Sequence, residues 1–195
     1  MHKIVIASGN KGKIREISEI LKGYEILSCK DVGFFEEIEE NGNSFYENAL
    51  IKAKTVCQRL NVVSLADDSG LCVSALDGAP GIYSARYSGI GTDEGNRKKL
   101  LEEMKAVTDR RAKFVSVIVV CFPDGRVISA EGETTGKILF SEDGENGFCY
   151  DSVFYSDDLK KSFGRATQKE KNSVSHRARA LNNLKESIKA EFDER

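Results

Sequence analysis

The sequence is poor in histidine and proline, with two residues of each among 195, and it contains no long apolar run. With only two histidines, one of them at position 2, a zinc site built from histidine and cysteine is not expected. The two prolines form no proline-rich linker and no repeat divides the chain, so residues 1–195 are expected to form one domain. The chain shows neither a segment as long as a membrane span nor the apolar stretch of a signal peptide, which predicts a cytoplasmic protein with no membrane partner.

The chain also lacks an excess of positive charge. Its 29 lysines and arginines and 31 aspartates and glutamates give a formal net charge of -2. A nucleic acid polymer selects a strongly basic surface, so the composition argues against such a partner. A small phosphorylated ligand stays open, because it needs only a local group of cations.

No two of the five cysteines form a CxxC pair, and their number is odd. Several stand in apolar runs such as residues 119–122 (VVCF). Free, buried thiols in a reducing compartment explain this pattern better than a disulfide framework does.

Strand and helix patterns alternate along the chain and predict an α/β fold. Apolar periodicity indicates a strand at 3–7, a loop at 8–13 and helices at 13–22 and after Gly42. A strand at 62–76 follows, broken by an acidic turn at 67–70, and then a helix at 95–107. The strand at 114–122 turns at 123–125 into an antiparallel partner, and the last helix lies at 175–192. Ser44 and Glu47 have capping-box spacing at the start of the second helix. A parallel opening followed by a hairpin predicts a mixed β-sheet with helices on both faces.

The first polar region that could carry chemistry is the loop between the first strand and helix. It consists of Ser8, Gly9, Asn10, Lys11, Gly12 and Lys13. Glycines there allow backbone N–H groups to approach a phosphate, and a helix N-terminus favours an anion. An ordinary turn with solvated lysines fits equally well, since the spacing is neither that of a Walker A loop nor GxGxxG.

Two acidic segments form the second region. The first is residues 36–40 (EEIEE), and an acidic run of this kind is usually part of a solvated surface. Asp67 and Asp68 lie in an apolar segment, where repulsion and desolvation destabilise two carboxylates unless a cation or hydrogen-bond donors compensate. Such oxygen ligands suit magnesium, although a turn in which an aspartate caps the backbone fits the spacing as well.

Two further regions stand near the C-terminus. Residues 147–151 (GFCYD) place a glycine beside two aromatic side chains that could stack on a flat base, although such a pair is more often part of a core. The other region contains the residues Lys171, Ser173, Ser175, His176 and Arg177. Cations at a helix N-terminus oppose the macrodipole, so either a ligand or an exposed basic turn with a serine cap explains them.

Five blocks, taken in order, cover nearly the whole chain: SGNKGKIREI, NSFYENALIKA, ADDSGLCVSALDGAPGIYSARYSG, GFCYDSVF and SHRARAL. Together they resemble the Ham1/inosine triphosphate pyrophosphatase family, which hydrolyses non-standard purine nucleoside triphosphates. The resemblance implies an elongated mixed α/β structure with two lobes and a central cleft. It also implies a homodimer and the use of magnesium, with manganese as the alternative ion.

The resemblance assigns a role to each region. Asp68 would be the catalytic base or the metal ligand that activates water, Glu39 would share the metal, and Ser69 would contact the substrate. Which glutamate of residues 36–40 reaches the metal stays open. The other implied substrate-binding residues are residues 8–13 for the triphosphate, Phe148, Cys149, Tyr150 and Asp151 for orienting the nucleotide, and Lys171, His176 and Arg177 for closing over the base.

Two residues depart from the family pattern GFGYDPxF. Cys149 replaces a glycine, so the backbone must tolerate a Cβ there, and Ser152 replaces a proline, which loosens the local chain. The implied reaction converts ITP, dITP or XTP to the monophosphate and pyrophosphate. The alternatives are a pyrophosphatase for other modified nucleotides and a nucleotide-binding protein without turnover.

Overall fold

The computed structural model describes residues 2–193, which divide into two compact units. The first unit comprises Met1–Asp68, Ser116–Gly132 and Arg177–Arg195. The second comprises Ser69–Val115 and Glu133–His176. Each unit is therefore built from segments that are far apart in the sequence.

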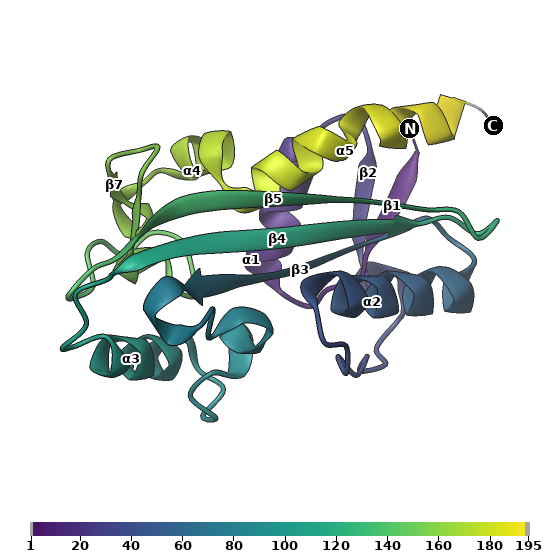
Figure 1. Ribbon diagram of the computed structural model, residues 1–195. Coiled ribbons are helices and arrows are strands. Elements are labelled where there is room, and N and C mark those ends of the chain that lie inside the picture. The colour runs from purple at the N-terminus through teal and green to yellow at the C-terminus, as the bar shows by residue number, and fades with distance from the viewer. Residues whose placement is uncertain (1, 194–195) are drawn as a thin grey trace. The chain divides into compact units, whose positions relative to one another are not determined.

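The strands form one seven-stranded sheet with the order β2-β1-β3-β4-β5-β6-β7, which confirms the predicted mixed β-sheet (Figure 1). β1 (Lys3–Ile6) is parallel to both β2 (Glu25–Ser28) and β3 (Ser64–Val73). β5 (Val127–Ile138) is antiparallel to β6 (Phe154–Ser156), and β6 is antiparallel to β7 (Lys161–Ser162). The predicted turn at 123–125 joins β4 (Arg111–Cys121) to β5, and a connection this short allows only an antiparallel pair.

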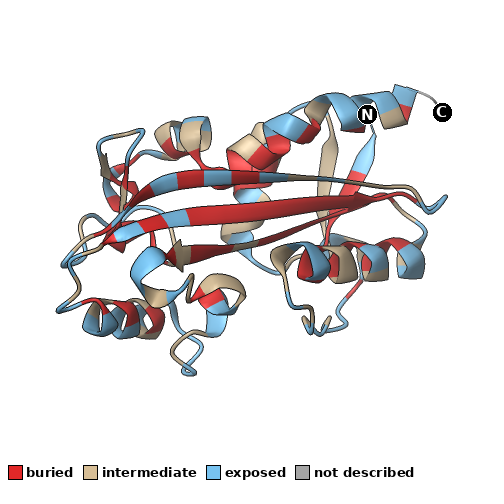
Figure 2. Cartoon of the chain, in the orientation of Figure 1, coloured by how far each residue is buried: buried red, intermediate tan, exposed pale blue. Residues whose placement is uncertain are grey.

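In the first unit, helices cover both faces of the sheet. Ile4 and Ile6 of β1 pack with α1 (Lys11–Ile20) and α5 (His176–Asp193), because alternate side chains of a strand point to the same face. Val5 points to the opposite face and packs against the alanine-rich side of α2 (Phe45–Leu60). With both faces covered, β4 is buried along most of its length (Figure 2).

The second unit has its own core. Leu100 of α3 (Asp93–Glu103) and Met104, the C-cap residue of this helix, pack there with Phe114, Phe154 and Phe163. α4 (Gln168–Val174) begins with a reciprocal capping box between Thr167 and Glu170. Short 3-10 turns complete the chain at Lys30–Val32, Ser74–Leu76, Gly81–Arg86, Asp151–Val153 and Phe163–Arg165.

Three predictions about the elements were wrong. β3 runs unbroken from Ser64 to Val73, so the predicted turn at 67–70 does not form. α1 begins at Lys11 rather than Lys13, because Asn10 is its N-cap and accepts a hydrogen bond from the Lys13 amide. The cluster from Lys171 to Arg177 was predicted to stand at the start of the last helix, but Lys171 lies in the separate helix α4.

The capping residue of the second helix was predicted correctly, since the Ser44 hydroxyl accepts a hydrogen bond from the Glu47 amide. All five cysteines are free thiols, as expected, with Cys57 and Cys121 buried and the other three half-buried. No helix in the described part of the chain is long and apolar enough to cross a membrane.

Candidate active site

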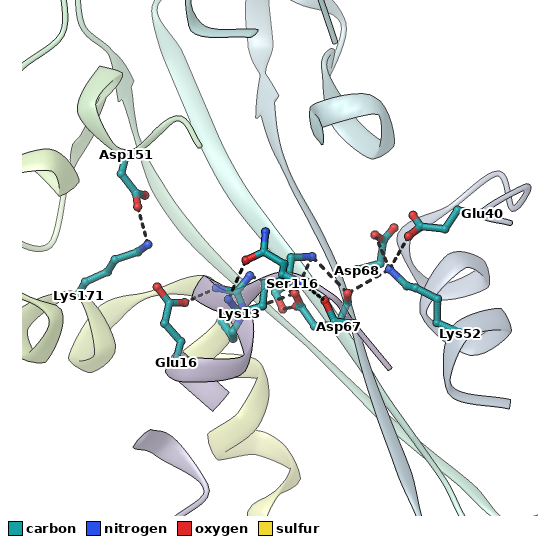
Figure 3. A network of polar contacts seen from close by, with 12 residues as sticks. Lys13, Glu16, Glu40, Lys52, Asp67, Asp68, Ser116, Asp151 and Lys171 are labelled. Atoms are coloured by element: carbon teal, nitrogen blue, oxygen red, sulfur yellow. Dashed lines mark hydrogen bonds and ion pairs between the residues drawn. The ribbon is translucent and has the colours of Figure 1, made fainter. Parts of the chain in front are cut away.

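Asp67 and Asp68 are adjacent in β3, and their carboxylates point to opposite faces of the sheet. Leu65, two residues before Asp67, packs with α1 and α5, whereas Ala66, two residues before Asp68, packs with α2. The alternation of side chains along a strand therefore separates the two negative charges. It also gives each carboxylate a different set of partners (Figure 3).

Asp67 is fully buried and is surrounded by donors. Its Oδ2 atom lies 2.9 Å from Lys13 Nζ and 3.0 Å from Arg177 Nη2, while Ser116 Oγ donates to Oδ1. Burial by itself raises the pKa of Asp67, but Arg177 and Lys13 outweigh that effect and hold the pKa well below its usual value. Asp67 is therefore ionised at neutral pH, and its charge is already neutralised by the protein.

Asp68 is buried too, but its carboxylate is only half satisfied. Oδ1 lies 3.2 Å from Lys52 Nζ, and Oδ2 has no hydrogen-bond partner among the described residues. Burial raises the pKa of Asp68, and the nearby Lys52 and Lys13 only partly oppose this effect. Of the two aspartates, Asp68 is the one with a carboxylate oxygen left to bind a water molecule or a cation.

Lys52 connects Asp68 to the acidic segment at residues 36–40. Its ammonium group is almost fully buried and lies 3.1 Å from Glu40 Oε1 (Figure 3). Burial lowers the pKa of Lys52, but Asp68 and Glu40 more than compensate and raise it above the usual value. Glu39, the glutamate that the family resemblance assigns to the metal, is exposed on the same loop.

The loop at residues 8–13 crosses from β1 to the first turn of α1. The side chain of Lys13 reaches back to β3 and donates to the main-chain carbonyl of Asp67 at 3.3 Å. Gly9, Asn10 and Lys11 are exposed, while Ser8 and Gly12 are half-buried. A helix N-terminus with exposed loop residues and an adjacent lysine suits a phosphate group, so the phosphate site stays a prediction.

In the second unit, Asp151 fixes the segment at residues 147–151. Its Oδ2 atom accepts hydrogen bonds from the Phe148 amide at 2.8 Å and from Lys171 Nζ at 2.6 Å (Figure 3). Lys171 also lies over the Phe148 ring, 4.5 Å from its centroid. Gly147 has a positive φ of 80°, and a Cβ there would lie 2.1 Å from Asp151 Oδ2, so only glycine fits this turn.

The two aromatic residues of this segment have different positions. Tyr150 is fully buried in the core and donates from its hydroxyl to the Ser84 carbonyl. Phe148 is half-buried, so it is the aromatic side chain of the pair that can contact a ligand. The expectation that aromatic residues in this segment belong to the core is therefore confirmed for Tyr150.

The remaining predicted residues lie close together in the sequence but have different surroundings. His176 is buried in the second unit, with its ring stacked on Phe114 at a centroid distance of 4.8 Å. Arg177 is buried in the first unit, where its guanidinium binds Asp67 and Glu16. Ser69, which follows Asp68 in β3, is half-buried.

Sequence reasoning missed three members of the group around the aspartates, namely Glu16, Lys52 and Ser116. Asn48 and Lys52 are four residues apart on the side of α2 that carries Ala49, Ala53 and Val56, and both are buried. A pair of polar residues on an apolar helix face indicates a buried polar function, so the pattern could have revealed Lys52. Glu16 and Ser116 had no comparable signal.

The residues around Asp68 fit a magnesium ion. No group of three or more histidine, cysteine, aspartate or glutamate side chains comes together in residues 2–193. Magnesium does not need one, because it usually binds one or two carboxylates and completes its shell with water and substrate phosphates. The buried Oδ2 atom of Asp68 supplies such an oxygen ligand.

Comparison with known proteins agrees with this arrangement. Residues 4–187 match the sequence profile of the Ham1 family. The dITP/XTP pyrophosphatase of Haemophilus influenzae is 48% identical over 193 residues, which span 95% of this chain and 98% of the relative. The enzyme of the same name from Clostridium perfringens is 46% identical, over 97% of this chain and 98% of its own.

Solved structures show the same fold. The Ham1 protein of Staphylococcus aureus has a TM-score of 0.87 and 42% sequence identity, covering 97% of this chain and 99% of its own. The HAM1 protein of Coxiella burnetii has a TM-score of 0.88 and 34% identity, covering 97% of this chain and 100% of its own. The match to the family profile and these relatives, which agree over nearly their entire lengths, show that the chain belongs to the Ham1 family.

Proposed function

We propose that this protein hydrolyses non-standard purine nucleoside triphosphates, namely ITP, dITP and XTP, to the monophosphate and pyrophosphate. The relatives that support this proposal are named dITP/XTP pyrophosphatases, and the extension to ITP follows the family resemblance. The structural observation that supports it is the contrast between the two adjacent aspartates. Asp67 is neutralised by Lys13 and Arg177, whereas Asp68 keeps an unsatisfied carboxylate oxygen.

Asp68 is the proposed catalytic base. It orients or deprotonates the water molecule that attacks the α-phosphorus, and Lys52 holds its carboxylate in place. Lys13 and the amides of residues 8–13 stabilise the triphosphate and the departing pyrophosphate. Asp68 and Glu39 are the proposed magnesium ligands. A magnesium ion bound there supplies charge neutralisation at the phosphate oxygens and a lower pKa for a bound water, and manganese suits the same ligands.

Phe148, Cys149, Tyr150, Asp151, Lys171 and His176 are proposed to orient the nucleoside part of the substrate. Phe148 and Lys171 offer a half-buried ring and a cation in one place. Inosine and xanthosine carry a 6-oxo group that accepts a hydrogen bond, whereas adenine presents an amino donor. Because Arg177 is buried against Asp67 and Glu16, a backbone N–H is the better supported donor to the 6-oxo group.

This pairing leads to a preference for ITP over ATP. A buried donor left facing another donor costs about 1–3 kcal/mol, which corresponds to roughly tenfold to hundredfold discrimination. A higher kcat/KM for ATP than for ITP would contradict this description of the base pocket. A homodimeric, cytoplasmic enzyme is proposed from the family resemblance, and the free thiols suit a reducing compartment.

The test is pyrophosphate release from ITP, XTP, dITP, GTP and ATP, each with magnesium and with a chelator. The proposal predicts metal-dependent release of pyrophosphate that is strongest for ITP, dITP or XTP. If none of the five is hydrolysed, modified pyrimidine triphosphates are tested next, and their turnover would favour a pyrophosphatase of different specificity. Binding of these nucleotides by a folded protein without any turnover would favour a nucleotide-binding role.

A further inference from the structure

The main chain of Cys149 is held by two side chains of one helix. The Cys149 amide donates to Asp93 Oδ2 at 3.0 Å, and Arg97 Nη1 donates to the Cys149 carbonyl at 2.9 Å. Asp93 and Arg97 are four residues apart in α3, so they lie on the same side of that helix. The N–H and C=O groups of Cys149 are therefore both hydrogen-bonded by side chains on one side of α3.

Cys149 needs such support because of its backbone conformation. Its φ is 58°, in the left-handed region that favours glycine. Asp151 anchors the residue before Cys149 by accepting a hydrogen bond from the Phe148 amide, and Asp151 itself is paired with Lys171. Asp93 and Arg97 of α3 hold the N–H and C=O groups of Cys149 itself.

The same arginine also connects to Ser152. Arg97 Nε lies 3.1 Å from Glu142 Oε1, and Ser152 Oγ donates to Glu142 Oε2 at 3.0 Å. The two residues that depart from the family pattern, Cys149 and Ser152, are therefore joined through one guanidinium and one carboxylate. Only one fifth or less of the Arg97 side chain is exposed, so water screens these contacts weakly.

We propose that Asp93 and Arg97 are positioning residues that set the conformation of residues 148–151 for binding the nucleoside part of the substrate. The inference rests on the proposed function and deepens it. Neither residue contacts the reacting atoms. They act through the main chain of Cys149, next to the Phe148 ring, where a small displacement of the backbone moves the surface against which a base packs.

The first test compares Arg97→Met with Arg97→Lys and with Lys98→Met. Arg97→Met removes the hydrogen bond to the Cys149 carbonyl and the ion pair with Glu142 but keeps an apolar stem, and Arg97→Lys restores the charge. Lys98 is the matched control because it is a neighbouring, exposed cation on the same helix that pairs with Glu94. Arg97→Met should raise the KM for ITP roughly tenfold and leave kcat within about twofold, because one charge-assisted contact to the loop is lost.

The binding of products separates positioning from general damage. Arg97→Met should weaken the binding of inosine monophosphate by a similar factor and leave the binding of pyrophosphate unchanged. Arg97→Lys should recover part of the loss, and Lys98→Met should behave as the wild type. Equal losses for both products, or no loss for either, would overturn the proposal.

Hydrogen exchange supplies a measurement that does not depend on activity. If Arg97→Met does not fold, Asp93→Ala removes the other half of the contact. In either variant, exchange at residues 148–151 should become faster, while exchange in β4 stays as in the wild type. Unchanged exchange at residues 148–151 would overturn the proposal. A wild-type protein that hydrolyses none of the nucleotides would reject the proposed function, whereas an active wild type with unaffected variants would reject only this inference.

Discussion

Arg177 donates two hydrogen bonds to the same oxygen of Asp67, with Nε and Nη2 at 3.3 and 3.0 Å from Oδ2. Both side chains are almost completely buried. The pair joins the first residues of α5 to the middle of β3, 110 residues away in the sequence. This ion pair allows the ionised Asp67 to lie inside the core, directly before Asp68, the proposed catalytic base, in the sequence.

Asp67→Asn should therefore destabilise the fold. The substitution leaves Lys13 and Arg177 without their shared counter-ion, and removing one partner of a buried pair costs about 3–5 kcal/mol. The measurement is the free energy of unfolding in urea. A change of less than about 1 kcal/mol, which is typical of a surface ion pair, would contradict the structural role of Asp67.

The same pair predicts how stability depends on pH. The pKa of Asp67 is lower in the folded state than in the unfolded chain, so its contribution is complete above the unfolded value and is lost as pH falls toward the folded one. The difference in unfolding free energy between the wild type and Asp67→Asn should be constant above about pH 5 and shrink below about pH 4. A difference that stays constant through the acid range would show that Asp67 does not titrate this way.

Asp68→Asn should have the opposite character, with a stable fold and little activity. Asparagine keeps the size of the side chain and can still accept a hydrogen bond from Lys52 at the position of Oδ1. Loss of a general base lowers kcat by roughly 100-fold to 10,000-fold. Steady-state kinetics and thermal unfolding of the same preparation test this, and normal turnover in the folded variant would reject Asp68 as the base.

Removal of divalent metal should stop turnover without unfolding the protein. Lys13, Lys52 and Arg177 already lie beside the two aspartates, so the fold does not require a metal ion as counter-charge. Thermal unfolding with a chelator should match that without it, and added magnesium should restore activity. Unfolding by the chelator, or full turnover in its presence, would contradict the proposed metal site.

Cys149→Gly should stabilise the protein slightly. A non-glycine residue at a φ of 58° is strained by about 1 kcal/mol or more, and the greater freedom of glycine in the unfolded chain offsets part of the gain. Gly147→Ala is the matched control, because its Cβ would collide with Asp151 and should destabilise by about 2 kcal/mol or more. Urea unfolding measures both, and a destabilised Cys149→Gly variant would show that the conformation is not strained.

The parts of the fold that the sequence predicts correctly are those decided by local chemistry. Ser44 caps its helix through a side chain that precedes an apolar periodic segment. The turn at 123–125 forces the hairpin of β4 and β5. Such signals involve neighbours in the sequence, so they can be read without the tertiary structure.

The predicted turn at Asp67 and Asp68 failed because tertiary contacts decide that segment. Lys13, Lys52 and Arg177 come from three different helices to satisfy the two carboxylates, so the strand continues through them. Sequence spacing indicated that some cation must compensate these aspartates, but it did not indicate which residues. The short strands β6 and β7 were missed for a related reason, since three and two residues carry too little periodicity.

The central claim is that water, activated at Asp68, attacks the α-phosphorus of a purine nucleoside triphosphate. Hydrolysis of ITP in water enriched with heavy oxygen, followed by mass spectrometry of both products, tests this claim most directly. The proposed mechanism predicts that the label enters inosine monophosphate and that the pyrophosphate is unlabelled. Label in the pyrophosphate, or release of single phosphates, would place the attack at another phosphorus and contradict the role assigned to Asp68.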